Sequence, residues 1–522
     1  MRISKGLLLL IITMLLIGYY LLCGIYLNNL GYFNQESLFF IEKSKIVFDG
    51  FGNRLQVMGL TTPILPFYAT FVFSVAKDLS LYAPVIASSL GTGVLFLIMA
   101  NVVSQRLNDD FYLLILIVIF LFHPGILYTA CSGKSIYMVL IFFFLFFFNI
   151  IKFYYSNTTF HISIASICLV FLVFCDYKFI WLTLFFIPLV LSITIHTLNL
   201  GEQESIFRLF MSFNNPALRR KLINKTFAIY IIIFLLPLAS VVIYKLLNLT
   251  HANDMNYFIE SPYANWNVLA DRVSFDRATD VVNNTSQQIT LLVTISALVF
   301  CPMILVALYL FRKNTYHIFT LLTPLAMLEF LQIKYDKVAV GYVYFIMFLV
   351  LALLCIIFKA KEVRHQFVLK IVLAVLTVVQ LYTGFIFLKH SSIDDERNFI
   401  TMLLERKADH SQDQNRDMAE YLSGLPGTEH VLVDDAIAYP VVAFTDSRNI
   451  QNLIMPYQEE FLTAIETPDK YVDYILLANH KNIVTGYTQL NDRYIQYLRR
   501  TLPHLRLQVV YQTDDWTLYK TL

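Results

Sequence analysis

The feature that most limits how this chain can fold is its series of long apolar runs, separated by short polar segments. A helix of about 20 apolar residues is long enough to cross the hydrocarbon core of a bilayer. Hydrophobic residues make up 57% of the 522 residues and charged residues 15%, whereas a soluble domain carries about 25% charge. The sequence therefore predicts a polytopic α-helical membrane protein and excludes an ordinary soluble protein.

Apolar runs of sufficient length predict about eleven membrane spans. They lie at about 7–27, 83–103, 110–128, 135–152, 160–175, 179–198, 226–247, 289–311, 316–333, 338–358 and 367–388. A further apolar segment at 61–76 is short, and Pro63 and Pro66 would break its first turns. We expect this segment to be re-entrant or interfacial, and this choice sets the side of every loop after it.

The basic residues of the short loops indicate the orientation. If the segment 61–76 does not cross, three basic loops lie on the side of the N-terminus, as the positive-inside rule requires. Their charges are Arg208, Arg219, Arg220, Lys221, Lys225, Arg312, Lys313, Lys359, Lys361, Arg364 and Lys370. We therefore expect a multi-pass protein of the plasma (inner) membrane with a cytoplasmic N-terminus. Its first apolar run is expected to be an uncleaved span rather than a signal peptide.

The composition changes sharply after Lys389 and divides the chain into two predicted domains. Residues 1–388 are expected to form a transmembrane domain with outer loops at 28–61 and 248–288. Residues 389–522 are expected to form an extracytoplasmic soluble α/β domain.

The α/β prediction for this C-terminal segment depends on its apolar patterns. A helical pattern runs from about Glu396 to Leu425, and short apolar runs at 431–434 and 474–479 are typical of buried strands. The segments LQVVYQ and WTLYKT suggest a closing hairpin. Asp434 and Asp435 follow a predicted strand, where such a pair more often caps the next helix than performs catalysis.

The first outer loop holds the most informative charged residues. Asn34 can cap a short helix that carries Glu36, and the apolar residues of that helix would let it lie on the membrane surface. An acid would then be held at the lipid boundary. The alternative is a surface anchor whose charges are merely solvated.

The order of these parts resembles the GT-C glycosyltransferases, a superfamily that includes protein O-mannosyltransferases and lipid A aminoarabinose transferase. In both, a first span precedes an outer loop with an acid near its start, a short helix, a proline-containing element and many further spans. The matching segments here are NQES, KSKIVFDG and TTPILPFY, the last being similar to a PPLYP-like element. The resemblance implies a GT-C-like fold.

The resemblance also implies a reaction and its catalytic residue. The loop acid of the family serves as catalytic base or as a partner of the acceptor, which implies Glu36, with Asp49 as the second candidate. An acceptor hydroxyl that attacks the sugar C1 must lose its proton, and a carboxylate can take it. The implied function is a glycosyltransferase that moves a sugar from a polyprenyl-phosphate donor to a glycan, lipid or protein acceptor at the outer face.

The departing lipid phosphate needs positive charge where water is scarce. Lysines in short outer turns could supply that charge: Lys134 in CSGKS, Lys178 in CDYKF, and Lys334 with Lys337 in IKYDK. The resemblance favours the last two turns, since DYK is similar to a TKG-type turn and the segment ending at Tyr342 to a late basic-aromatic turn. Each lysine could instead only reach lipid headgroups.

Neither a cofactor nor a metal site is indicated by residue spacing. The six cysteines form no CxxC pair and the histidines lack metal-like spacing, so the need for a divalent metal is left open. Many relatives carry an Arg and then an Asp in the turn before the fourth span, whereas this chain has SGKSIYM with no acid, so the resemblance implies no second catalytic carboxylate or metal ligand there. The net charge of +2 is nearly balanced, and we expect membrane lipid and the lipid-linked donor, rather than nucleic acid, as partners.

Two other functions remain open on the sequence. A non-enzymatic transporter or flippase would need ionisable residues in the middle of spans, where Glu329 is the notable exception. A polysaccharide polymerase or ligase would be expected to place arginines in its large outer loops, and Arg272 and Arg277 keep that function open.

Overall fold

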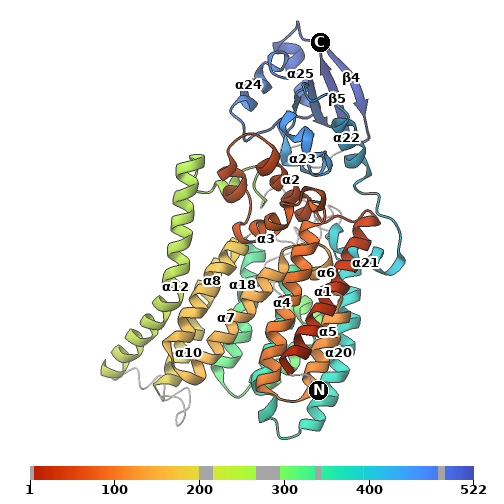
Figure 1. Ribbon diagram of the computed structural model, residues 1–522. Helices are drawn as coiled ribbons and strands as arrows, with labels where there is room; N and C mark the ends of the chain where they lie inside the picture. Colours follow the sequence, from red (N-terminus) through yellow and green to blue (C-terminus); the bar gives the residue numbers. More distant parts are fainter. Residues whose placement is uncertain (1–4, 199–215, 266–293, 335–341, 392, 480–487) are drawn as a thin grey trace.

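The computed structural model describes residues 5–198, 216–265, 294–334, 342–391, 393–479 and 488–522. Long helices form an elongated bundle, and the C-terminal residues form a smaller region of strands and short helices at one end of it (Figure 1). The N-terminus lies toward the opposite end of the bundle, and the helices of the first outer loop lie where the two regions meet (Figure 1).

Among the described residues, six helices are long and apolar enough to cross a membrane. They are α1 (Lys5–Asn29), α4 (Ala83–Arg106), α7 (Ile136–Ser156), α12 (Pro216–Ala252), α19 (Tyr342–Lys359) and α20 (Gln366–Lys389). Much of the surface of α1, α12 and α20 is exposed and apolar, as expected of helices that face lipid.

Three further candidates are helix pairs that bend at a short break. The bends are 61° between α5 (Asp110–Phe122) and α6 (Pro124–Cys131), 47° between η3–α9 (Tyr177–Phe185) and α10 (Ile187–Thr197), and 105° between Thr294–Phe300 and α17 (Met303–Phe311). The shorter apolar helices α8 (Thr159–Cys175) and α18 (Thr315–Lys334) complete the set. Each of the predicted runs thus coincides with a helix or helix pair, but only six to nine of them, within the described residues, pass the test of length and composition.

Two of these breaks are joined by one polar cluster inside the bundle. Pro124 and Pro302 lie at the 61° and 105° bends, where proline cannot continue the helical hydrogen bonds. The Gln380 amide of α20 donates to the carbonyl of Phe300 and lies 3.2 Å from Nε2 of His123. Gln380 therefore supplies hydrogen-bond partners to a backbone carbonyl and a side chain, which lipid tails could not do.

The proline-containing segment 61–76 forms a short helix, α3 (Ile64–Ser74). This helix starts directly after Pro63, and Pro66 lies in its first turn, where a missing N–H breaks no helical hydrogen bond. The two prolines therefore begin the helix rather than break it. Eleven residues extend only about 16 Å, which is too short for a full crossing and fits the expected re-entrant or interfacial segment.

The first outer loop forms α2 (Gln35–Asp49), and Asn34 caps it by accepting a hydrogen bond from the Glu36 N–H at 3.0 Å. The expectation that α2 lies on the membrane surface was wrong. Every residue from Glu36 to Val47 is buried. The helix packs against α3 on one side and against α23 (Asp435–Phe444) of the C-terminal region on another.

The C-terminal region contains a five-stranded mixed sheet in the order β2-β1-β3-β5-β4. The strands are β1 (Val431–Leu432), β2 (Leu453–Ile454), β3 (Tyr474–Ala478), β4 (Leu507–Gln512) and β5 (Trp516–Thr521). Strand β1 is parallel to both β2 and β3. Strand β5 is antiparallel to both β3 and β4. The strands expected at 431–434 and 474–479 correspond to β1 and β3, and the expected hairpin to β4–β5.

Helices surround this sheet. They are α21 (Asp394–Glu405), α22 (Asp413–Ser423), α23, α24 (Glu460–Glu466) and α25 (Asp492–Thr501). The single helical pattern predicted from Glu396 to Leu425 is divided into α21 and α22, because Arg406 adopts a left-handed conformation with φ 55° and ends the first. Ile46 and Val47 of α2 share a core with this region, so the outer loop is packed into it.

Polar contacts mark the two ends of the bundle. Near the N-terminus, Lys5 donates to Asn108, and Lys370 pairs with Asp109 at 2.5 Å. At the other end of α1, the carbonyl of Leu30 accepts from the Asp409 N–H at 2.8 Å. Lys5 and Lys370 thus lie at the end of the bundle away from the C-terminal region.

This arrangement predicts that a reporter fused after Lys361 is cytoplasmic and one fused after Leu522 is extracytoplasmic. The reason is the separation of the basic loops from the C-terminal region along the bundle. Paired alkaline phosphatase and green fluorescent protein fusions measure the two sides. If both positions report the same side, the assignment of 61–76 as a non-crossing segment is wrong.

Candidate functional site

Glu36 lies in the first turn of α2, where α2 meets the turn before α7. Its side chain is 9% exposed and accepts a hydrogen bond from the Ser135 hydroxyl. The Ser37 hydroxyl donates to the carbonyl of Ser132 at 3.2 Å. Gly133 makes this approach feasible, because it has φ +77° and a Cβ there would lie 2.5 Å from Oγ of Ser37.

The backbone just before Glu36 is fixed by the C-terminal region. A carboxylate oxygen of Asp395, in α21, accepts from the Asn34 amide and from the Gln35 N–H, each at 3.2 Å. The Tyr439 hydroxyl of α23 donates to the Gln35 amide oxygen at 2.7 Å. Two helices of the C-terminal region thus orient the segment that carries Glu36.

Lys178 belongs to a compact polar group at the same site. Asp176 caps η3 (Tyr177–Trp181) by accepting from the Lys178 N–H, and its other carboxylate oxygen lies 3.5 Å from Nζ of Lys178. The Lys178 ammonium also contacts the Tyr344 hydroxyl, which donates to Asp176 at 2.8 Å. Asp176, Lys178 and Tyr344 thus form one polar group, while Lys134 precedes Ser135, which donates to Glu36.

The other predicted donor-site residues are placed less fully. Nζ of Lys334, at the end of α18, lies 3.6 Å from the centroid of the Trp181 ring, three residues after Lys178. Lys337 lies outside the described residues. Tyr342 begins α19, and its side chain is also outside the described part.

Tyr344, rather than Tyr342, is the tyrosine that contacts Lys178 among the described side chains. Sequence analysis did not single it out. The segment GYVYF indicates an aromatic residue near the turn, and the packing of α19 brings Tyr344 to Lys178.

Asp49 does not join Glu36. It is the last residue of α2, roughly 20 Å from Glu36 along the helix axis, and it pairs with the ammonium of Lys77. The side chain of Lys77 is 61% exposed, so this is an ordinary surface ion pair. Asp49 therefore lies away from Glu36 and pairs with a different residue, Lys77.

A second polar group, which the sequence did not reveal, lies wholly buried between α2 and α23. Nζ of Lys43 is 2.5 Å from a carboxylate oxygen of Asp435, 2.5 Å from the Tyr457 hydroxyl and 3.2 Å from Glu42. The side chains of Lys43, Glu42 and Asp435 have no exposed surface. Asp434 caps α23 as expected, whereas Asp435 serves as the partner of Lys43.

The protonation of this buried group follows from its surroundings. Burial raises the pKa of Glu42 well above its ordinary value, and the nearby Asp435 charge adds to the effect. Burial by itself would lower the pKa of Lys43, but the charges of Asp435 and Glu42 outweigh it and raise that pKa. Burial thus disfavours the charged form of Glu42, while the opposite charges nearby favour the charged form of Lys43.

The second lysine of α2, Lys45, anchors the other end of α23. Nζ of Lys45 donates to the carbonyls of Ala443 and Thr445, each at 2.7 Å. These carbonyls lie at the C-terminal end of α23, where a cation is favoured by the helix dipole. Burial lowers the pKa of Lys45 to about 8.

Two further groups bear on metal binding and transport. Within the described residues, no group of three His, Cys, Asp or Glu side chains is placed to hold a metal ion.

Glu329, the residue that kept a transporter open on the sequence, accepts a hydrogen bond from the Thr294 hydroxyl at 2.7 Å and lies five residues before the end of α18. Arg272 and Arg277 lie outside the described residues.

The fold matches that of a solved membrane protein. The crystal structure of ArnT from Cupriavidus metallidurans bound to undecaprenyl phosphate aligns with a TM-score of 0.55, over 98% of this chain and 97% of ArnT. The two chains share a fold. Because their sequences are only 11% identical, the match supports the expected GT-C-like fold alone. No protein-family model matches the chain, and no curated protein sequence does.

The buried pair yields a prediction about stability. Asp435→Asn should lower the free energy of unfolding by about 3–5 kcal/mol, because it leaves the buried Lys43 charge without its partner. Thermal and denaturant unfolding of the purified protein in detergent measures the loss.

The matched control is Lys77→Met, which breaks the exposed pair with Asp49 and should cost no more than about 1 kcal/mol. Equal losses in the two variants would contradict the role given to the Lys43–Asp435 pair.

Proposed function

We propose that this protein is a membrane glycosyltransferase that transfers a sugar from a polyprenyl-phosphate donor to an acceptor at the outer face of the membrane. The observation that supports the proposal is the contact of Glu36 with Ser135, the residue after Lys134, in a fold that matches ArnT over nearly the whole chain. In the proposed membrane orientation, the N-terminus is cytoplasmic and the C-terminal region is extracytoplasmic.

The proposed chemistry assigns the proton transfer to Glu36. The acceptor oxygen forms a bond to C1 of the sugar, and the bond between C1 and the phosphate oxygen breaks. The electron pair of that bond leaves with the lipid phosphate, and the proton of the acceptor hydroxyl passes to the Glu36 carboxylate. The Ser135 hydroxyl, which donates to Glu36, orients this carboxylate.

The lysines would compensate the charge that develops on the departing phosphate. Lys178 is held in place by Asp176 and Tyr344 before any ligand arrives, so little reorganisation is needed. Lys134 adds a second charge to the same neighbourhood. Lys334, stacked on Trp181 and exposed, is proposed to reach the phosphate from the neighbouring turn. Lys337 and Tyr342 stay candidates by resemblance alone.

The lipid partner has support from the structural match. ArnT was crystallised with undecaprenyl phosphate, and it shares the fold of this chain over nearly its whole length. A polyprenyl phosphate sugar is therefore the donor we propose here, with a glycan, lipid or protein as acceptor.

Substitution of Glu36 by Gln tests the proposed base. Gln has a similar size and can still accept from Ser135, but it cannot take a proton, so turnover should fall by about 10²–10⁴. Transfer from labelled lipid-linked sugars in isolated membranes measures the loss.

The matched control for Glu36→Gln is Asp49→Asn, which removes an acid from the far end of the same helix and should leave turnover unchanged. Loss of activity in Asp49→Asn with full activity in Glu36→Gln would assign the base to Asp49. Full activity in both variants would refute the mechanism.

Substitution of Lys178 by Met tests the donor site. The apolar stem is kept while the charge is lost, so binding of the donor phosphate should weaken while the protein still folds. Binding of labelled undecaprenyl phosphate to purified variants measures this, with Lys77→Met as the control for loss of a lysine elsewhere. Unchanged binding in Lys178→Met would leave Lys178 as a structural partner of Asp176. Repeating the measurement with a chelator tests whether a divalent metal takes part.

A further inference from the structure

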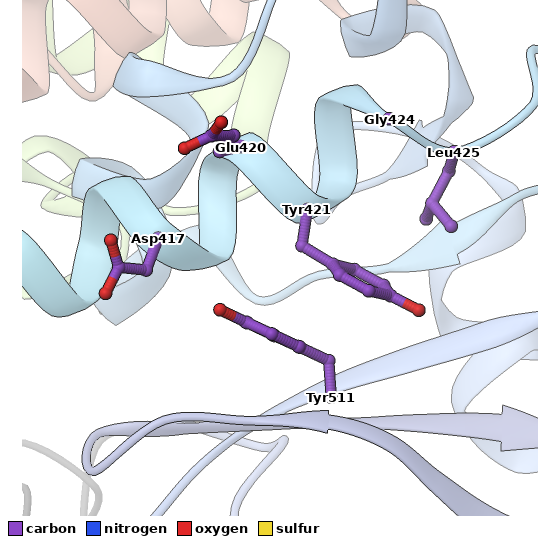
Figure 2. Close-up of a pocket in the computed structure, with 6 residues that line it drawn as sticks. All are labelled: Asp417, Glu420, Tyr421, Gly424, Leu425 and Tyr511. Carbon is purple, nitrogen blue, oxygen red and sulfur yellow. The ribbon is translucent and has the colours of Figure 1, made fainter.

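The C-terminal region contains an open cavity that the proposed reaction does not use. It lies between α22 and β4 and has a volume of about 400 Å³ (Figure 2). Its lining residues are Asp417, Glu420, Tyr421, Gly424, Leu425 and Tyr511. A volume of this size lies within the range of small-molecule sites in proteins.

Two tyrosine rings form the aromatic wall of this cavity. The rings of Tyr421 and Tyr511 are stacked, with centroids 4.4 Å apart and planes inclined by 12° (Figure 2). Both side chains are only partly buried, and both pack on the core shared by α2, α23 and the sheet. The wall is therefore rigid and offers both a flat apolar surface and phenolic hydroxyl groups, which suits a ligand with apolar and hydroxylated faces.

The polar wall consists of hydrogen-bond acceptors. Asp417 shares a face of α22 with Tyr421 and Gly424, which are four and seven residues further on, and Glu420 lines the cavity from the adjoining face (Figure 2). Both carboxylates are exposed, and in the described part of the chain neither has a hydrogen-bond or ion-pair partner. Gly424 has no side chain to fill the cavity between them and Leu425.

These walls select the chemistry of a ligand. A carboxylate only accepts hydrogen bonds, so the cavity favours groups that donate them, such as hydroxyl and ammonium groups. The six lining residues include neither Lys nor Arg, which disfavours a phosphate or a carboxylate. A sugar ring has C–H groups that pack on an aromatic wall and hydroxyl groups that donate to carboxylates.

We propose that this cavity binds one sugar ring of the acceptor, preferring an amino sugar over a neutral sugar and excluding an acidic one. The inference deepens the proposed function, on which it rests, by assigning the acceptor to the glycans. The donor phosphate would remain at Lys178, whereas the cavity holds the water-soluble part of the other substrate.

The cavity is joined to the candidate catalytic residue by packed helices. Helix α22 packs against α23, and α23 holds α2 through Asp435, Tyr439 and the carbonyl of Ala443. Glu36 begins α2. A glycan bound at the cavity is therefore attached to the same rigid assembly that orients the proposed base.

The test measures sugar binding to the full-length protein in lipid nanodiscs, by saturation-transfer nuclear magnetic resonance. The probes are glucosamine, glucose and glucuronic acid. Affinity is expected to decrease in that order, with glucuronic acid unbound. Tyr511→Ala should weaken glucosamine binding by roughly two- to tenfold, the amount expected for loss of an aromatic contact.

The double variant Asp417→Asn, Glu420→Gln should abolish the preference for glucosamine over glucose. It changes only exposed charges and so keeps the test valid if Tyr511→Ala fails to fold. The controls are Tyr497→Ala and Glu460→Gln, an exposed tyrosine and an exposed acid on α25 and α24, which should leave binding unchanged.

Three results would overturn the inference: no binding of any probe, binding that Tyr511→Ala and the double variant leave unchanged, or equal losses in the controls. Binding of a lysine-rich peptide in place of the sugars would also overturn it and assign the cavity to a protein partner. Sugar binding needs no turnover and is repeated in Glu36→Gln. In the unsubstituted protein, bound sugar without any transfer activity would therefore refute the proposed function, whereas transfer without bound sugar would refute only this inference.

Discussion

Lys43 carries its charge in a place that water does not reach, and the Asp435 carboxylate at 2.5 Å is what makes that charge tolerable. One partner belongs to the first outer loop and the other to the C-terminal region, nearly 400 residues later in the chain. A buried pair of this kind is costly to break, because each charge would be left without its partner. The position of α2 relative to α23 is therefore fixed.

The fixed position of α2 determines what its first turn can meet. Asp395 and Tyr439 hold the residues just before Glu36, and Ser135 donates to the Glu36 carboxylate. Lys178, in a separate turn, is held by Asp176 and Tyr344. The C-terminal region is thus part of the candidate site, although it supplies none of the residues proposed to touch the donor.

Features that depend on neighbouring residues could be predicted, and those that depend on distant ones could not. Asn34 and Asp434 cap their helices as expected, since a cap bonds to an N–H two residues away. The position of α2 on the membrane surface was predicted wrongly, because its pattern does not show that another region covers it. Glu36 and Lys178 were found as single candidates, whereas Tyr344 and the buried Lys43–Asp435 pair were not.

The sequence by itself determined that the chain is a helical membrane protein, where its apolar helices lie, and that the C-terminal segment contains strands and a hairpin. These properties follow from local hydrophobicity and periodicity, which any short window of sequence displays. Only the tertiary structure decided which charges are buried, that Tyr344 contacts Lys178, and that Asp49 lies apart from Glu36. The physical reason is that burial and electrostatic pairing are properties of residues brought together from far along the chain.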